Sequence, residues 1–213
     1  MVPFRGPDAK RRLAPMGAEE RSELALAMLG DVLAACRVVG ETTVVTADDS
    51  AAELAQELGA WVVGDPGGGQ GAAVAAALGS GRTLVVNADL PCATPHDLRQ
   101  LERAVPEHGL ALVEASDGTT NALGLSAAAL FAPLYGRGSA ERFRTLAPSV
   151  SVVLPNLAWD VDTVADLERV QHAAGPRTQA ALAALARFVA ATAKPATATE
   201  RPGRALPGPP GYA

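Results

Sequence analysis

Residues 83–91 read Thr-Leu-Val-Val-Asn-Ala-Asp-Leu-Pro, an apolar run that ends in an aspartate and a proline turn. The run predicts a strand over Thr83–Asn87, because adjacent β-branched residues are typical of strands buried on both faces. Working outward, Met1–Phe4 is long enough only for the stub of a first strand. Short apolar runs predict four further strands, at Thr42–Thr46, Trp61–Val63, Leu110–Glu114 and Ser151–Leu154.

Helical patterns separate these strands, over Glu19–Cys36, Ser50–Leu58, Pro95–Ala104 and Val164–His172. Thr94 and Thr163 are good N-cap residues for the last two helices. Strands that alternate with helices predict an α/β fold, with a mostly parallel central sheet and helices on both faces. Ligands bind at the carboxyl ends of the strands in such sheets, so functional residues should follow the strands directly.

The chain has 213 residues, which suits one large domain with a buried core. We expect that domain to occupy residues 1–173. The remainder, residues 174–213, is rich in Ala and Pro and is predicted to be a disordered extension, with a weak helical pattern at Ala180–Ala191.

Composition and charge exclude some classes of partner. The formal net charge is −5, which argues against non-specific binding to nucleic acid. The sequence has no apolar run of about 18 residues, so no membrane span is expected. Cys36 and Cys92 lie far apart in apolar segments, and we expect two free buried thiols in a reducing, cytoplasmic environment.

Three carboxylates are candidates for a metal site. Asp89 directly follows a predicted strand, and carboxylate oxygens suit a Mg²⁺ ion that carries substrate phosphates. Asp160 and Asp162 should point to the same side of an extended segment and could converge with Asp89. The alternatives are that Asp89 only shapes a turn and that Asp162 only caps the following helix or pairs with a cation.

Three other segments could bind anions. Lys10 and Arg12 belong to a run of cations that could hold a triphosphate, although such runs are usually solvated surface. The loop Gly67–Gly71 lets backbone N–H groups approach a ligand, and it also weakly matches a dinucleotide fingerprint; the alternative is a flexible surface loop. The segments Gly118–Asn121 and Tyr135–Ser139 suit a small anion, or are an ordinary turn and an ordinary helix start.

Taken in order over residues 2–172, these segments resemble the guanylyltransferase family of coenzyme F-420 biosynthesis (CofC/FbiD). The matches include Val2–Arg5 with "VPVK", Asp65–Ala73 with "D-PGGGLNAA", Asn87–Pro91 with "PADLP", Asp117–Leu123 with "DGTGTNAL" and Asp160–Asp162 with the start of "DVDTPEDL". The resemblance implies a compact nucleotidyltransferase (glycosyltransferase-A-like) fold. It also implies transfer of GMP from GTP onto the phosphate of phosphoenolpyruvate or 2-phospho-L-lactate, with release of pyrophosphate.

The resemblance implies a role for each candidate residue. The nucleotide would be bound by Lys10, Arg12, Gly67, Gly68, Gly69 and Gly71. The phosphorylated three-carbon acid would be bound by Thr120, Gly136 and Ser139. Mg²⁺ would be held by Asp89, Asp160 and Asp162, and the catalytic residues would be Asp89 and Lys10. The expected partners are therefore GTP and the acid, with no nucleic acid and no membrane, and a homodimer is left open.

Other functions remain as alternatives at this point. A molybdenum-cofactor or sugar-phosphate nucleotidyltransferase would open with a glycine-rich loop, whereas only Gly6 precedes Lys10 closely here. An NAD-dependent oxidoreductase would use the loop that starts at Gly67. An inactive paralogue would bind a partner without catalysis.

Overall fold

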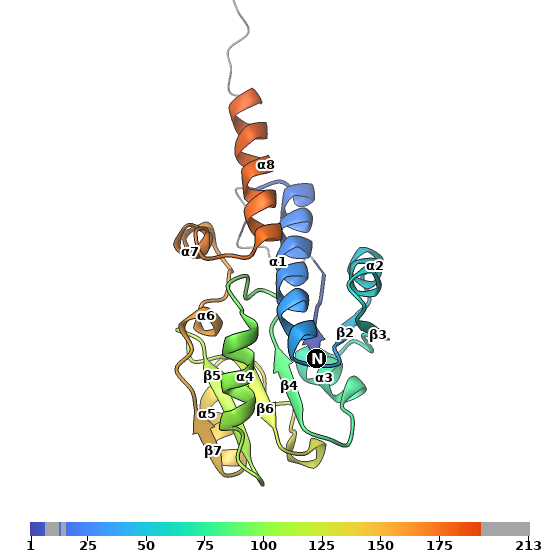
Figure 1. Ribbon diagram of the computed structural model, residues 1–213, viewed down its shortest axis with the longest axis vertical. Coiled ribbons are helices and arrows are strands. Elements are labelled where there is room, and N and C mark those ends of the chain that lie inside the picture. Colours follow the sequence, from blue (N-terminus) through green and yellow to red (C-terminus); the bar gives the residue numbers. More distant parts are fainter. Residues whose placement is uncertain (7–12, 14–15, 193–213) are drawn as a thin grey trace, which may run out of the picture.

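The computed structural model describes residues 1–6, 13 and 16–192 (Figure 1). Its strands are β1 (Val2–Pro3), β2 (Thr43–Thr46), β3 (Trp61–Gly64), β4 (Thr83–Val86), β5 (Leu110–Glu114), β6 (Thr120–Leu125) and β7 (Ser149–Ser151). Its α-helices are α1 (Ala18–Val39), α2 (Asp49–Glu57), α3 (Gln70–Ala77), α4 (Pro95–Ala104), α5 (Ser139–Leu146), α6 (Pro155–Ala158), α7 (Val164–Val170) and α8 (Pro176–Thr192). A 3₁₀ turn, η2, spans Ala128–Leu130.

The strands form two sheets that meet at β1. Strands β1, β2 and β3 are parallel, and in the second sheet, ordered β4-β6-β5-β7, strand β6 is antiparallel to both of its neighbours. Two hydrogen bonds join the sheets, because the amine of Met1 donates to the Leu84 carbonyl (2.8 Å) and the N–H of Val86 donates to the Met1 carbonyl (3.0 Å). The predicted α/β fold with a mostly parallel sheet is confirmed, and the carboxyl ends of β1, β2, β3 and β4 lie along one edge.

Helices cover both faces of this sheet, and the strand residues divide between two cores. Val86 and Ala111 pack with residues of α1, α2 and α4. Their neighbours Val85 and Leu112 pack on the other face, with Phe143 of α5 and a residue of α3. Because successive strand residues point to opposite faces, each pair of adjacent apolar residues in a strand places one side chain in each core.

The structure differs from the sequence-based prediction at two strands. Strand β6 was missed, because Thr120–Leu125 contains Asn121 and Gly124 and resembles a turn in the sequence. The predicted strand Ser151–Leu154 is also wrong, since β7 ends at Ser151. Leu154 is already the N-cap of α6 with a proline at its first turn, and a proline there favours the start of a helix.

The capped helices agree closely with the sequence. Helix α4 has the predicted bounds, and Thr94 forms a capping box with Asp97, in which each side chain accepts from the other residue's backbone N–H. Thr163 caps α7 in the same way with Asp166, although α7 ends at Val170 instead of His172.

Helix α8 lies within the predicted C-terminal extension. It begins at Pro176, before the expected Ala180, and lies against α1 (Figure 1). The carboxylate of Asp31 in α1 accepts hydrogen bonds from the backbone N–H groups of Arg177 (3.0 Å) and Thr178 (2.8 Å). The weak helical pattern predicted over Ala180–Ala191 therefore lies within α8, which is longer than that pattern. The division of the chain at residue 173 stays a prediction, and residues 193–213 lie outside the described residues.

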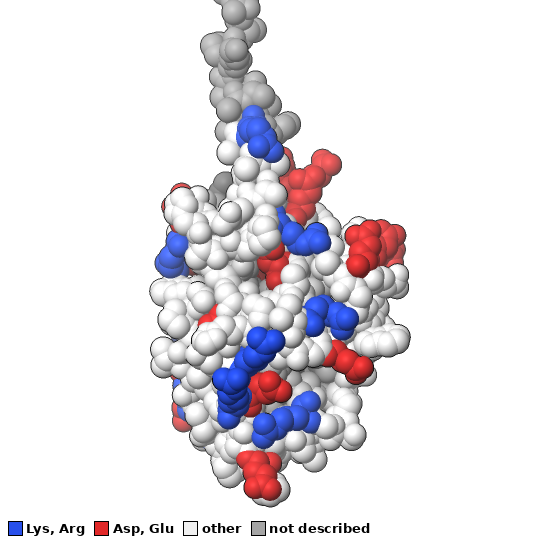
Figure 2. Space-filling model, viewed as in Figure 1, with Lys and Arg blue, Asp and Glu red and all other residues white. Residues whose placement is uncertain are grey.

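Both cysteines are free and buried, as predicted. Burial raises the pKa of the Cys36 thiol to about 11, and it also raises the pKa of Cys92. None of the described helices is both long and apolar enough to cross a bilayer. Figure 2 shows basic and acidic side chains interspersed on the face that carries α1 and α4.

Candidate functional site

Three carboxylates from distant parts of the chain meet at the carboxyl end of β4. Asp89 follows β4, whereas Asp160 and Asp162 lie between α6 and α7. The N–H of Val161 donates to the backbone carbonyl of Asp89 (3.1 Å), which ties the two segments together. The Val161 side chain is completely buried, so the alternation along this extended segment places Asp160 and Asp162 on its other side.

The geometry of this group suits a divalent cation. One carboxylate oxygen from each of Asp89, Asp160 and Asp162 lies within 4.8 Å of the other two. Burial, followed by the nearby charge of Asp89, raises the pKa of Asp160, while a hydrogen bond from Asn121 opposes that rise. Three half-buried carboxylates repel one another, and oxygen ligands of this kind are what Mg²⁺ and related hard cations prefer.

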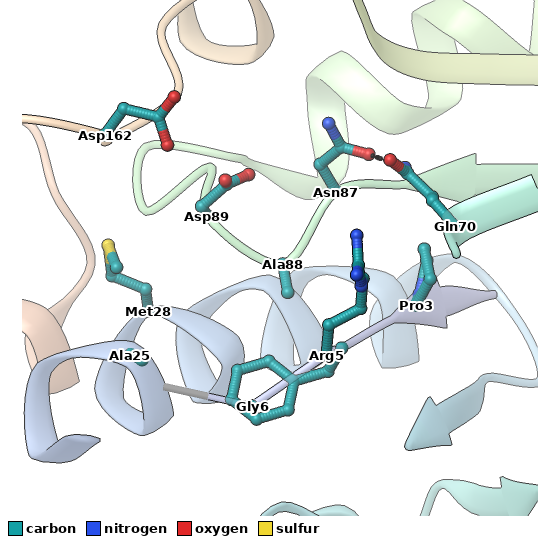
Figure 3. Close-up of a pocket in the computed structure, with 11 residues that line it drawn as sticks. Pro3, Arg5, Gly6, Ala25, Met28, Gln70, Asn87, Ala88, Asp89 and Asp162 are labelled. Carbon is teal, nitrogen blue, oxygen red and sulfur yellow. Dashed lines mark hydrogen bonds between the residues drawn. The ribbon is translucent and has the colours of Figure 1, made fainter. Parts of the chain in front are cut away.

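A cavity of about 200 Å³ opens beside the carboxylates. It is lined by Pro3, Phe4, Arg5, Gly6, Ala25, Met28, Gln70, Asn87, Ala88, Asp89 and Asp162. In Figure 3, Asp89 and Asp162 lie at one end, Asn87 and Gln70 lie at the other, and Arg5 reaches upward near the amides. Among the described residues that line the cavity, Arg5 is the one cation, so the cavity combines an acidic end with a basic and amide end.

A chain of amide side chains connects the far end of the cavity with the carboxylates. Gln70 Nε2 donates to Asn87 Oδ1 (2.7 Å), as the dashed line in Figure 3 shows. Asn87 Nδ2 lies 3.4 Å from Asn121 Oδ1, and Asn121 Nδ2 donates to Asp160 Oδ1 (3.2 Å). The metal-binding candidates are thereby linked to the start of α3.

The glycine loop adopts a conformation that favours glycine. Gly67, Gly68 and Gly69 all have positive φ angles, of 80°, 81° and 95°, and lead directly into α3. None of these three lines the cavity, and Gln70 does so instead. Gly71 is buried in α3, where an added Cβ would lie 2.5 Å from Pro133 Cβ. Packing against Pro133 therefore explains Gly71, which is not among the residues that line the cavity, and its predicted contact with the nucleotide stays a prediction.

The residues expected to bind the acid are close together. Ser139 Oγ donates to Thr120 Oγ1 (3.0 Å), and both side chains are buried. The Ser139 N–H donates to the carbonyl of Gly136 (2.9 Å), whose φ of 107° requires glycine. The Ala140 N–H donates to Gly118 (3.3 Å), so the start of α5 is attached to the turn before β6. The backbone of Thr120 connects this group to the amide side chains, because its carbonyl accepts a hydrogen bond from Asn87 Nδ2 (3.3 Å).

The remaining candidates, Lys10 and Arg12, lie outside the described residues, and their predicted contact with phosphates stays a prediction.

Sequence reasoning missed several residues of the site. Arg5 follows β1 and Asn87 follows β4, so the rule that selected Asp89 could have selected both. Asn121 and Gln70 lie in segments that were considered for anion binding, but nothing in the sequence singled out their side chains. Asn121 lies in an antiparallel strand that was not expected, and Gln70 reaches Asn87 through the path of the glycine loop.

Comparison with known proteins identifies relatives over most of the chain. Residues 1–197 match the family described as "Guanylyl transferase CofC like". A phosphoenolpyruvate guanylyltransferase from Nocardia farcinica is 38% identical over 192 residues, with 82% of this chain and 85% of that protein covered. The enzyme of the same name from Mycolicibacterium smegmatis is 33% identical over 189 residues, with 83% and 86% covered.

Solved structures share the fold at low identity. A protein from Desulfovibrio desulfuricans, named as a candidate nucleotide-diphospho-sugar transferase, has a TM-score of 0.68 at 16% identity, with 89% of this chain and 95% of that chain covered. A nucleotidyl transferase from Methanothermobacter has a TM-score of 0.55 at 16% identity, with 80% and 94% covered. The expected nucleotidyltransferase-like fold is confirmed.

Proposed function

Because the chain belongs to the CofC-like family of guanylyl transferases, we propose that it transfers GMP from GTP onto the phosphate of phosphoenolpyruvate, releasing pyrophosphate. This reaction would serve coenzyme F-420 biosynthesis. The observation that carries the proposal is the group formed by Asp89, Asp160 and Asp162 at the mouth of a cavity that also presents Arg5. Such a site suits two anionic substrates that must be brought together.

The three carboxylates would hold Mg²⁺. When bound there, the ion would neutralise phosphate charge and favour attack on phosphorus. Their fit rests on the convergence of three oxygen donors in a half-buried position, since hard divalent cations prefer carboxylate oxygens. Magnesium is proposed ahead of softer metals because no thiol or imidazole belongs to the group.

The chain's own residues would bind and orient the substrates. The Arg5 guanidinium would bind a phosphate of GTP through charge-assisted hydrogen bonds, and Gln70, at the same end of the cavity, would contact the nucleotide. Lys10 and Arg12 are further proposed contacts of the triphosphate. The Ser139 and Thr120 hydroxyls bond to each other and the Ser139 N–H donates to Gly136, so the backbone N–H groups of Arg137 and Gly138 would orient the three-carbon acid.

The reaction needs positioning more than proton transfer. A phosphate oxygen of the acceptor attacks the α-phosphorus of GTP, the bond from that phosphorus to the bridging oxygen breaks, and pyrophosphate leaves with its electron pair. The attacking oxygen is already an anion near neutral pH, so no general base is required. None of the described residues lining the cavity is a histidine, which agrees with this mechanism.

The acceptor is proposed from the relatives. The curated relatives from Nocardia and Mycolicibacterium carry the name phosphoenolpyruvate guanylyltransferase. Phosphoenolpyruvate is therefore favoured over 2-phospho-L-lactate, which has a tetrahedral carbon beside the carboxylate in place of a planar one.

A pyrophosphate-release assay tests the proposal. The purified protein should release pyrophosphate from GTP in the presence of Mg²⁺ and phosphoenolpyruvate, more slowly with 2-phospho-L-lactate, and not without an acceptor. Asp89→Asn should lower the rate by at least about 100-fold, the scale of lost electrostatic stabilisation at an active site. Asp49→Asn, an equal change of charge at an exposed position in α2, is the control and should keep the parent rate. Absence of turnover with either acceptor would count against the proposed function.

A further inference from the structure

The side chain of Asn121 is a buried polar group in the middle of the sheet. It is 1% exposed and lies in β6 between β4 and β5. The residues that follow it, Ala122 and Leu123, are apolar core residues. A buried amide is unfavourable unless its hydrogen-bonding groups are satisfied, and an apolar residue would be the simpler choice for packing. The hydrogen bonds that the Asn121 amide makes therefore indicate its functional role.

The backbone fixes which way this amide points. Asn87 Nδ2 donates to the backbone carbonyl of Thr120 (3.3 Å), an oxygen that can only accept. The same nitrogen faces Asn121 Oδ1, so the amide nitrogen of Asn121 must face Asp160. With its nitrogen directed at Thr120 and Asn121, Asn87 presents its amide oxygen to Gln70, whose Nε2 donates to it. One carbonyl thus sets the orientation of all three amides.

Backbone contacts also hold the two middle members of this chain, Asn87 and Asn121, in place. The N–H of Asn87 donates to the carbonyl of Asn121 (3.0 Å), and β4 pairs with β6 just beyond it. Asn121 therefore presents a fixed N–H donor to Asp160, the carboxylate that has the two other acidic groups beside it.

We propose that Asn121 is a positioning residue whose amide holds the Asp160 carboxylate in the orientation that binds the divalent cation together with Asp89 and Asp162. The inference rests on the proposed function in one respect, that a cation binds these carboxylates. A donor on one carboxylate oxygen restricts rotation of the group and offsets part of its charge. Partners of metal ligands act in this way, and their loss typically weakens metal affinity by about 10–100-fold.

Direct binding of Mn²⁺, used in place of Mg²⁺, tests the inference without turnover. The chain has two tryptophans, Trp61 and Trp159. Trp61 is 69% exposed, so Trp61→Phe should be harmless and leaves Trp159, the residue before Asp160, as the fluorescent reporter. Free Mn²⁺ is measured by electron paramagnetic resonance and compared with quenching of Trp159.

In this background, Asn121→Leu keeps the side-chain size and removes the donor. We expect its Mn²⁺ dissociation constant to rise by about 10–100-fold. In the assay, its apparent KM for the metal should rise, while kcat should recover substantially at saturating metal. The matched control is Asn156→Leu, because Asn156 Nδ2 donates to Asp97 (3.0 Å), an aspartate outside the three-carboxylate group. This control should bind Mn²⁺ as the parent does.

A second variant covers the case in which Asn121→Leu does not fold. Asn87 is only partly buried, and Asn87→Ala removes the donor that orients Asn121. We expect Asn87→Ala to weaken Mn²⁺ binding by a smaller factor, of about three- to ten-fold, since Asn121 keeps its donor but loses its fixed orientation.

The outcomes separate this inference from the proposed function. If the parent binds Mn²⁺ and the folded variants bind it equally well, Asn121 does not position Asp160 and the inference is wrong, although the cation site stands. Failure of the parent to bind Mn²⁺ would overturn the cation site, and the inference with it.

Discussion

At the scale of single residues, the charge of the Asp160 carboxylate lowers the stability of the folded protein. Its carboxylate is partly buried between two other acidic groups, and burial together with the charge of Asp89 raises its pKa. Burial and the neighbouring charge disfavour the ionised form of Asp160, and the proposed cation would favour that form. Residues of this kind can be replaced with a gain in stability and a loss of function.

We therefore predict that Asp160→Asn stabilises the metal-free protein. Because the folded-state pKa lies above the ordinary value of 3.8, the folded protein keeps this proton to higher pH than the unfolded chain. The contribution of Asp160 to stability falls as the pH rises through that window, and it remains unfavourable at pH 7. Asparagine has no such charge and still offers Oδ1 to Asn121.

The measurement is urea unfolding at pH 7 and at a pH below 3.8, without metal. At pH 7 the variant should gain roughly 0.5–2 kcal/mol, and the gain should shrink at the lower pH. The same variant should bind Mn²⁺ poorly. A loss of stability at pH 7 would contradict the prediction.

The two thiols give a second prediction at this scale. The pKa of Cys36 is raised to about 11 by burial, and that of Cys92 is raised too, so both stay protonated and shielded near pH 8. A disulfide reagent such as Ellman's reagent should react with neither thiol in the native protein within minutes, and with both after unfolding in guanidinium. A rapid stoichiometric reaction of the native protein would show that one thiol is accessible.

At the scale of elements, α8 depends on its attachment to α1. The carboxylate of Asp31, itself buried in α1, accepts from the first backbone N–H groups of α8. These groups have no partner within the helix, and the negative charge also suits the positive end of the helix dipole. One side chain thus joins residues that are far apart in the sequence.

We predict that Asp31→Ala destabilises the protein by about 1–2 kcal/mol, the typical effect of losing a helix cap. Amide hydrogen exchange should accelerate in α8 while the Mn²⁺ affinity stays unchanged. Asp48→Ala is the matched control, because the Asp48 side chain caps α2 by accepting from the Ala51 N–H. It should accelerate exchange in α2 and leave α8 protected. If exchange in α8 does not change on loss of Asp31, that carboxylate does not hold the helix in place.

At the scale of the whole molecule, the site lies where the two sheets meet. Arg5 follows β1 of one sheet, whereas Asp89 follows β4 of the other, and both line the same cavity. A ligand in this cavity would contact both sheets and stabilise the folded state by mass action.

We accordingly predict that GTP with Mg²⁺ raises the Tm. At about 100 times the dissociation constant the stabilisation is roughly 2.7 kcal/mol, which corresponds to about 5–10 °C for a chain of this size. Asp89→Asn should lose most of this increase, whereas Asp49→Asn should retain it. Stabilisation by NADH but not by GTP with Mg²⁺ would instead favour an oxidoreductase.

The sequence by itself determined the features that depend on neighbours along the chain. These include the strand that ends before Asp89, the capped starts of α4 and α7, and the burial of both cysteines. Side-chain periodicity and helix caps act over a few residues, so they can be read locally. The order of the motifs identified the family without any knowledge of contacts.

The tertiary structure alone decided which of these residues meet. The convergence of Asp89 with Asp160 and Asp162 was no more than a possibility in the sequence, because it depends on the hydrogen bond from Val161 to a residue 72 positions earlier. Strand β6 gave no local signal, since it is specified by pairing with β4 and β5. The sequence placed Asn121 in a candidate anion-binding segment, but only the structure shows its contacts with Asn87 and Asp160. The role of a buried amide depends on the groups that it faces, and tertiary packing determines those groups.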